Sequence, residues 1–199
     1  MKKLRPNYIV GIGGSAGGLT AYKALLDALP FKTGMAFVII SHMSPAASSQ
    51  LAQILSRRTK MPVLICSDGM LIERNHVYVI PPDADLFIEN YSFKVIRPRI
   101  RRNTQVDIFL TSLADAMGPH AIGIILSGYD GDGAEGCKQI KAKGGTTFAQ
   151  DESAEVSHMP QNAKDTDCVD FVLSPKKISA ELQKMVSISK NKAKKRRSR

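Results

Sequence analysis

Residues 10–19 read VGIGGSAGGL, a glycine-rich turn with one serine, Ser15, at its centre. The apolar residues before the turn are typical of a short buried strand, and Leu19, Tyr22 and Leu25 follow it at helical spacing. A strand, a glycine turn and a helix in this order predict a βα unit of an α/β sheet. Ser15 is therefore expected at the carboxyl end of a strand, where such sheets carry their binding sites.

Three interpretations of this turn remain open on these residues alone. Residues 13–17 fit G-x-S-x-G, the sharp turn that exposes a nucleophilic serine. Residues 11–16 equally fit G-x-G-x-x-G/A, in which glycines let a pyrophosphate approach a helix N-terminus. The third interpretation is a tight turn without any chemistry.

The next strand separates these interpretations. Residues 35–40 form a continuous apolar run, as in a central parallel strand. A dinucleotide site would need an Asp or Glu near its end, but the sequence continues with Ser41 and His42. Adjacent parallel strands open into one crevice, so His42 is expected beside Ser15 as the base that activates its hydroxyl. The alternative for His42 is a loop or capping role.

A third strand end supplies carboxylates. The apolar run 121–126 is followed by SGYDGDGAEG at 127–136. Asp130 or Asp132 could orient a catalytic histidine, or both could serve only as turn and N-cap residues. The order serine, histidine, aspartate along the chain differs from the order in α/β-hydrolases. An ordinary lipase or esterase fold is therefore not expected.

The chain resembles the catalytic domain of the CheB family of chemotaxis protein-glutamate methylesterases, from about residue 8 to about residue 185. The resemblance implies a doubly wound, mostly parallel α/β sheet with helices on both faces. It rests on five segments in the family's order: GGSAGG (13–18), ISHMSP (40–45), HVYVIPPDADLFI (76–88), LSGYDGDGAEG (126–136) and FAQDESAEVSHMP (148–160).

The resemblance implies a catalytic triad of Ser15 as nucleophile, His42 as base and Asp132 as the orienting carboxylate. The aspartate of the family pattern falls on Asp132, and Asp130 stands where glycine is usual. The implied reaction is hydrolysis of glutamyl γ-methyl esters on a chemoreceptor in bacterial chemotaxis adaptation, with deamidation of receptor glutamines as a second activity. A catalytically silent adaptor with the same fold is the alternative.

Departures from the family pattern surround this triad. Ala16 replaces a threonine and Tyr129 replaces a methionine, and their backbone N–H groups are the candidate oxyanion donors. Arg101 and Arg102 stand near the position of a His-Arg-Pro sequence and are expected along the approach of an acidic substrate. No cofactor is implied, and no metal site is expected because the histidines and cysteines lack ligand-like spacing.

Length and composition predict a single α/β domain over residues 1–187. The first strand begins by residue 8, so no receiver domain is expected in this chain, which is either a free-standing methylesterase-like protein or an excised domain. A free-standing form would need another route of regulation, such as a partner protein. Three cysteines and the lack of a long apolar run indicate a cytoplasmic protein without a transmembrane segment. The partner expected from the resemblance is a methyl-accepting chemoreceptor or a similar methylated signalling protein.

The net charge of +10 is concentrated in the sequence KNKAKKRRSR at residues 190–199. Residues 188–199 are therefore expected to be a disordered basic tail. Attraction to an acidic receptor, an anionic membrane or nucleic acid are its possible roles. Specific nucleic-acid binding is not expected, because aromatic residues are few and no binding motif is present.

Periodicity predicts alternating strands and helices along the chain. A small antiparallel hairpin is expected from residues 86–88 and 93–96. Strands are expected near 8–12, 35–40, 77–80, 121–126, 146–149 and 170–173, and helices near 18–29, 47–58, 106–117, 134–143 and 176–187.

Overall fold

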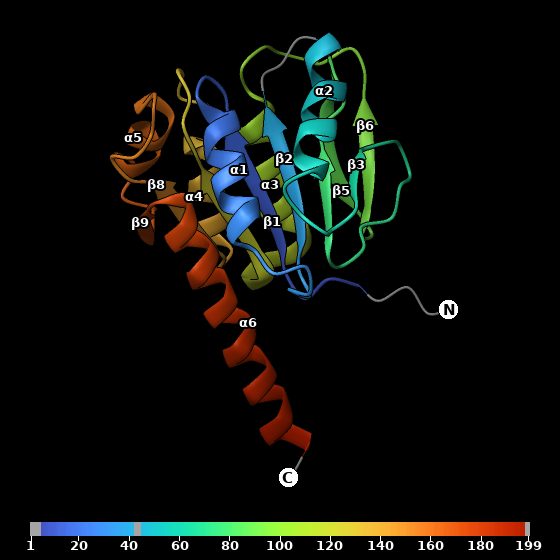
Figure 1. The fold of residues 1–199 in the computed structure, drawn as a ribbon, viewed down its shortest axis with the longest axis vertical. Helices are drawn as coiled ribbons and strands as arrows, with labels where there is room; N and C mark the ends of the chain where they lie inside the picture. The colour runs from blue at the N-terminus through green and yellow to red at the C-terminus, as the bar shows by residue number, and fades with distance from the viewer. Residues whose placement is uncertain (1–4, 42–44, 198–199) are drawn as a thin grey trace.

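A seven-stranded parallel sheet forms the centre of the molecule (Figure 1). The computed structural model describes residues 5–41 and 45–197, without the side chains of residues 45–49 and 188–197. The strand order is β3-β4-β2-β1-β7-β8-β9, and every pair of neighbours is parallel. The strands are β1 (Ile9–Gly14), β2 (Ala36–Ser41), β3 (Val63–Ile65), β4 (His76–Val79), β7 (Ala121–Ile125), β8 (Thr146–Gln150) and β9 (Phe171–Leu173).

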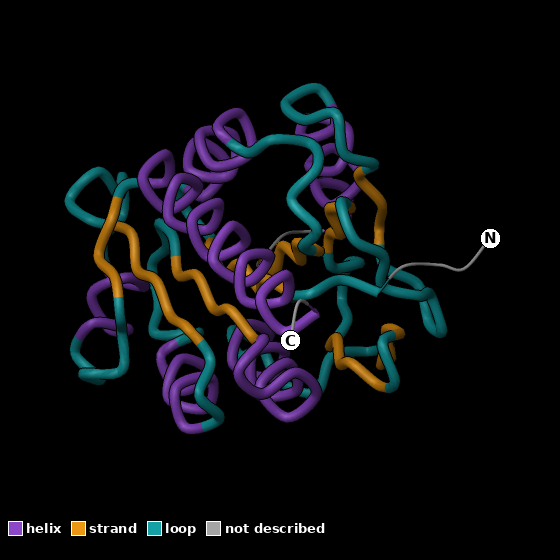
Figure 2. Tube along the Cα trace, turned by 90° about the horizontal axis from the view of Figure 1, so that it is seen from below, coloured by secondary structure: helices purple, strands orange, loops and turns teal. Residues whose placement is uncertain are grey.

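Helices cover both faces of this sheet (Figure 2). One apolar cluster joins β1 and β2 side chains such as Val10 and Phe37 to three helices, and a second joins Ile9 and Val38 to the other three. The first face carries α1 (Gly18–Ala28), α2 (Pro45–Ser56) and α6 (Pro175–Arg197), and the second carries α3 (Gln105–Met117), α4 (Ala134–Ala142) and α5 (His158–Lys164). The predicted doubly wound α/β fold is confirmed.

The predicted hairpin is also confirmed. β5 (Asp85–Glu89) and β6 (Ser92–Ile96) pair antiparallel as a separate two-stranded sheet. The hairpin packs against α3, and the backbone N–H of Ile88 donates to the hydroxyl of Ser112 at 2.9 Å. This unit adds a layer beside α3 without extending the main sheet.

The topology brings three strand ends together. β1 lies between β2 and β7. The strands that follow β1 in the chain are first added on its β2 side, and the later strands are added on its β7 side. The carboxyl ends of these three parallel strands share one edge of the sheet, and a binding crevice is expected at such a switch point. The Ser15 turn follows β1, and the turn that contains Asp132 follows β7.

Three elements were not expected from the sequence: β3, α5 and the short 3-10 helix η1 (Gly118–His120). β3 has only three residues, VLI, so its apolar run is too short to show a strand period. α5 is a seven-residue helix that contains Pro160, and proline does not favour helix in sequence patterns. β3 and α5 take their conformation from neighbours, since β3 pairs with β4 and α5 packs on α4 and β8.

Helix α6 continues well past its expected end at residue 187. The structure assigns helix through Arg197, and the helix projects from the body of the molecule (Figure 1). The backbone of residues 188–197, which lie in the segment expected to be a disordered tail, is assigned to this helix. A lysine- and arginine-rich sequence without glycine or proline has good helix propensity, so it can extend an existing helix. The division of the chain at residue 187 stays a prediction.

Candidate active site

Ser15 stands directly after β1, in the turn that leads into α1. Its side chain is half-buried, and Ala16 beside it is exposed. The chain reverses through Gly17, whose φ of 73° lies in the left-handed region that favours glycine. The backbone N–H of Gly18 then donates to the carbonyl of Ser15 at 2.9 Å. This geometry presents the serine at the edge of the sheet, as a nucleophile turn requires.

The Ser15 turn is in direct contact with the turn after β7. The backbone N–H of Ser15 donates to the carbonyl of Ser127 at 2.9 Å. A Cβ atom on Gly128 would come within 1.9 Å of the Met159 sulfur and 3.1 Å of the Ser15 nitrogen. A larger residue would force the buried Met159 side chain to move, so glycine suits the point where these two turns meet.

Ser127 joins three segments of the site, and the sequence patterns did not single it out. Its buried hydroxyl donates to the carbonyl of Ala16 at 2.8 Å and accepts from the N–H of Val156 at 2.9 Å. Its own N–H donates to Oε1 of Gln150 at 3.0 Å. The only sequence signal for this role is a hydroxyl residue directly after a continuous apolar strand.

Asp132 is buried, with 3% of its surface exposed. One carboxylate oxygen accepts from the N–H of Val106 at 3.0 Å and the other from the N–H of Asp107 at 2.8 Å. These donors belong to the first turn of α3, whose dipole favours a negative charge at this end. Oδ1 of Asp130 accepts from the N–H of Asp132 at 3.1 Å, so Asp130 has the turn role expected as its alternative.

Asp107 is a second acid that the sequence patterns assigned no role. Its Oδ1 accepts from the N–H groups of Gly133 at 2.9 Å and Gly136 at 2.7 Å, at the start of α4. Burial raises the pKa of Asp107 to about 6; the N–H donors oppose this shift, and the charge of Asp132 adds to it. Asp107 therefore changes charge within reach of neutral pH, next to the proposed catalytic aspartate.

The structure brings Ser15 and Asp132 to the same edge of the sheet but shows no direct bond between them. His42, the residue expected between them, lies outside the described residues. The triad as an assembled unit therefore stays a prediction. Within the described residues, no group of three histidine, cysteine or acidic side chains is arranged to hold a metal ion.

The candidate oxyanion donors differ in exposure and in surroundings. Tyr129 has 68% of its surface exposed, and its ring packs edge-on against His158, with centroids 4.8 Å apart. Among the residues that the structure describes, the backbone N–H groups of Ala16 and Tyr129 donate to no protein acceptor. Both groups are therefore free to bind a ligand oxygen.

Arg101 and Arg102 are exposed in the loop between β6 and α3. The carbonyl of Arg101 accepts a hydrogen bond from Nε2 of Gln105. No contact joins either guanidinium to the Ser15 turn within the described part of the chain. Their expected role along the substrate approach stays a prediction.

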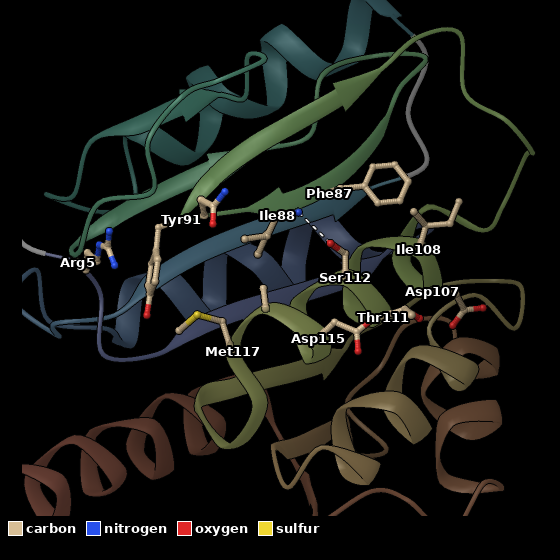
Figure 3. Close-up of a pocket in the computed structure, with 12 residues that line it drawn as sticks. Arg5, Phe87, Ile88, Tyr91, Asp107, Ile108, Thr111, Ser112, Asp115 and Met117 are labelled. Atoms are coloured by element: carbon tan, nitrogen blue, oxygen red, sulfur yellow. Dashed lines mark hydrogen bonds between the residues drawn. The ribbon is translucent and has the colours of Figure 1, made fainter.

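The cavity of about 790 Å³ lies away from this turn, between α3 and the β5–β6 hairpin (Figure 3). Asp107 stands at one end of it and Met117 at the other, and none of the described candidates Ser15, Ala16, Tyr129 and Asp132 lines it. A smaller cavity of about 240 Å³ adjoins Gly17 and Glu155. We place the candidate site at the strand ends rather than in the larger cavity, because the half-buried Ser15 and the free N–H groups of Ala16 and Tyr129 lie there.

Comparisons with known proteins indicate the family of this chain. The family model described as CheB methylesterase matches residues 10–182. A putative protein-glutamate methylesterase/protein-glutamine glutaminase of Leptospira interrogans is 33% identical, over 84% of this chain and 89% of its own length. A protein-glutamate methylesterase/protein-glutamine glutaminase of Hydrogenovibrio crunogenus is also 33% identical, over 88% of this chain but 50% of its own length.

One solved structure shows the same fold. The chain matches the Thermotoga maritima CheB methylesterase catalytic domain with a TM-score of 0.83 and 28% identity. The match covers 89% of this chain and 98% of that domain. Within the described residues, no helix is long and apolar enough to cross a membrane.

Proposed function

Because this chain belongs to the CheB methylesterase family, we propose that it hydrolyses glutamyl γ-methyl esters on a chemoreceptor during chemotaxis adaptation. The observation that carries this proposal is the joined pair of turns at the sheet edge. Ser15 is presented by one turn and bonded through its N–H to the other, which also carries the buried Asp132. Deamidation of receptor glutamines is the second activity, since an amide presents the same carbonyl to the serine.

The proposed mechanism is acyl transfer through Ser15. His42 removes the hydroxyl proton as Oγ attacks the ester carbonyl, and it then protonates the departing methoxide, which leaves as methanol. The N–H groups of Ala16 and Tyr129 stabilise the tetrahedral oxyanion, each by roughly 3 kcal/mol as in other hydrolases. Water activated by His42 then hydrolyses the acyl-enzyme and returns the free glutamate.

Asp132 has two tasks in this proposal. Its carboxylate orients the imidazole of His42 and balances the positive charge that forms there during the reaction. The two N–H donors from α3 hold the carboxylate rigidly at 2.8 and 3.0 Å, so it is preorganised before substrate binds. A rigid carboxylate costs little reorganisation energy at the moment of reaction.

The substrate and partners follow from the same proposal. The proposed substrate is a methylated side chain of a chemoreceptor, in keeping with the family to which the chain belongs. The guanidinium groups of Arg101 and Arg102 attract acidic residues that flank the ester. A cytoplasmic location is proposed, where the methylated segments of chemoreceptors lie, together with a regulatory partner protein.

Methanol release from a methylated chemoreceptor fragment tests this function. Wild-type protein should release methanol, and Ser15→Ala should abolish release while still binding the fragment. Ser56→Ala is the matched control, because Ser56 is an exposed serine on α2 that bonds only within its own helix. Binding without any methanol release by wild type would favour the adaptor function instead.

A further inference from the structure

Helix α5 contacts the carbonyl groups of three consecutive residues in the turn after β7. Two of these contacts come from side chains and one comes from the backbone. The pairs are the Met159 N–H with the Gly128 carbonyl (3.0 Å), Nδ1 of His158 with the Tyr129 carbonyl (3.1 Å) and Nδ2 of Asn162 with the Asp130 carbonyl (3.2 Å).

The contact from His158 does not depend on its charge. A carbonyl oxygen only accepts hydrogen bonds, so Nδ1 must carry the proton that is shared with Tyr129. The neutral ring with hydrogen on Nδ1 and the charged imidazolium both satisfy this requirement.

Glycines flank the residues that α5 holds. Tyr129 and Asp130 lie between Gly128 and Gly131, and glycine has the greatest freedom of backbone rotation. Without restraint, the peptides of this short stretch could rotate at small cost. The side chains of His158 and Asn162 supply that restraint from a helix that is packed on α4 and β8.

The restraint fixes the direction of backbone donors. In a trans peptide the carbonyl and the N–H point in opposite directions, so carbonyls turned toward α5 leave the N–H groups facing away from it. The Tyr129 N–H belongs to the Gly128–Tyr129 peptide, whose carbonyl accepts from the backbone N–H of Met159, and Gly128 touches the Ser15 turn. His158 and Asn162 hold the carbonyls of the next two peptides, on the other side of Tyr129. The Tyr129 N–H has no protein acceptor among the described residues, as an oxyanion donor requires.

We infer that His158 and Asn162 are positioning residues for the oxyanion site, which they fix by holding the carbonyls of Tyr129 and Asp130. This inference rests on the proposed function, since it requires Ser15 to be an acylated nucleophile. Neither side chain touches the reacting atoms. Their effect is indirect: the Met159 N–H holds the peptide that carries the Tyr129 N–H, and the two side chains hold the peptides that follow, so the backbone on both sides of Tyr129 stays in place when negative charge develops.

His158 could act through its hydrogen bond to the Tyr129 carbonyl or through the contact of its ring with the Tyr129 ring. Two variants separate the hydrogen bond from the ring contact. His158→Phe keeps an aromatic ring against Tyr129 but removes the donor. His158→Asn removes the ring but keeps an N–H donor near the position of Nδ1. A positioning role predicts that phenylalanine fails and asparagine succeeds.

The test measures how fast an alkyl fluorophosphonate labels Ser15, followed by intact mass and peptide mapping. This probe needs the nucleophile and the oxyanion donors but no receptor. His158→Phe and Asn162→Asp should each slow labelling about tenfold, and the double variant about a hundredfold, as expected when an oxyanion donor is misaligned. His158→Asn should stay within about threefold of wild type. With methylated receptor, the same variants should lower kcat and leave KM unchanged.

Gln161→Ala is the matched control on the same helix. The Gln161 side chain bonds to Asp165 and does not reach the turn after β7. His158 and Asn162 are both exposed, so the melting temperatures of their variants should stay near that of wild type. Labelling of His158→Phe and Asn162→Asp at the wild-type rate would overturn the inference. Fast labelling of His158→Phe with slow labelling of His158→Asn would also overturn it, in favour of the ring contact.

The two assays separate this inference from the proposed function. Wild type that is labelled at Ser15 but releases no methanol from methylated receptors would refute the substrate proposal, while the labelling rates of the variants would still support the inference. Wild type that releases methanol, with variants equal to it in both assays, would refute the inference alone. Absence of labelling in wild type would overturn both.

Discussion

Asp132, which precedes α4, caps the N-terminus of α3, and Asp107, which lies on α3, caps the N-terminus of α4. Asp132, just before α4, accepts hydrogen bonds from two backbone N–H groups in the first turn of α3, one of which belongs to Asp107. Asp107, on α3, accepts from the N–H groups of Gly133 and Gly136 at the start of α4. The two helices are therefore locked together at the edge of the sheet that holds the candidate site.

Removal of the Asp132 carboxylate should affect both stability and catalysis. Asp132→Asn keeps one acceptor for the α3 donors, so we expect a loss of about 1 kcal/mol in the free energy of unfolding. We also expect kcat to fall by about 10⁴, as when the triad aspartate of other serine hydrolases is neutralised. Urea unfolding and methanol release measure the two effects.

Asp107→Asn is the matched control for that prediction. It changes the reciprocal cap while leaving Asp132 in place, so kcat should stay within about threefold of wild type. If Asp107→Asn reduced kcat as strongly as Asp132→Asn, the catalytic assignment of Asp132 would be wrong.

The pKa of Asp107 predicts a pH dependence of stability. Burial raises this pKa to about 6, so the folded protein binds the proton more tightly than the unfolded chain. The resulting stabilisation is fully present below about pH 4 and is lost as the pH rises through about 6.

Asp107→Asn lacks this titration, and its amide oxygen can still accept from Gly133 and Gly136. Relative to wild type, the variant should therefore gain about 1 kcal/mol in the free energy of unfolding between pH 4 and pH 7, after allowance for solvent screening at this half-buried group. Urea denaturation at several pH values measures the difference. If the difference in the free energy of unfolding between variant and wild type stayed constant with pH, or shifted in favour of wild type as the pH rises, the raised pKa of Asp107 would be contradicted.

The Ser127 hydroxyl should be needed to align the Ser15 turn. Ser127→Ala leaves the Val156 N–H and the Ala16 carbonyl without this partner, which should cost about 1–3 kcal/mol of stability. The rate of methanol release should fall as well, and Ser127→Thr should recover most of it because the hydroxyl is kept. Equal rates for the alanine and threonine variants would show that the hydroxyl is not needed.

Gly17 and Gly69 form a natural pair for testing the packing of the turn. Both have φ near +70°, so alanine at either position should cost about 1–2 kcal/mol in backbone strain. A Cβ on Gly17 would also lie 2.5 Å from Oγ of Ser127, whereas a Cβ on Gly69 meets nothing within 4 Å. Thermal unfolding should therefore show a larger loss for Gly17→Ala, and only that variant should lose methanol release. Equal losses of thermal stability in the two variants would show that the Ser15 turn accommodates a Cβ atom at position 17.

The charges of Arg101 and Arg102 should govern the salt dependence of substrate binding. The variant with both changed to glutamate should raise KM at low salt and flatten its dependence on ionic strength. Lys60→Glu with Arg74→Glu is the control, because these exposed residues precede β3 and β4 at the opposite edge of the sheet. An unchanged salt dependence in the Arg101 and Arg102 variant would remove them from the substrate approach.

The sequence predicted the features that depend on local patterns. The glycines around Ser15 and the apolar runs at residues 35–40 and 121–126 were sufficient for the parallel strands at the centre of the sheet, and the CheB resemblance is confirmed. The positions of Ser15 and Asp132 at strand ends follow from the same patterns.

The remaining features depend on contacts between distant segments. Ser127 reaches Ala16 and Val156, and Asp107 reaches the start of α4, so no local pattern marks either role. The short α5 carries proline and polar residues, and its side chains matter because they meet a turn nearly thirty residues earlier.

The most direct test of the central claim, that Ser15 attacks a glutamyl methyl ester, is the rate of methanol release from a methylated chemoreceptor fragment. Wild type and Ser15→Ala should be compared at equal concentrations, with binding of the fragment measured in parallel. The account predicts release by wild type, equal binding by both proteins, and a rate at least about 10³-fold lower for Ser15→Ala. Methanol release by Ser15→Ala at the wild-type rate would contradict it.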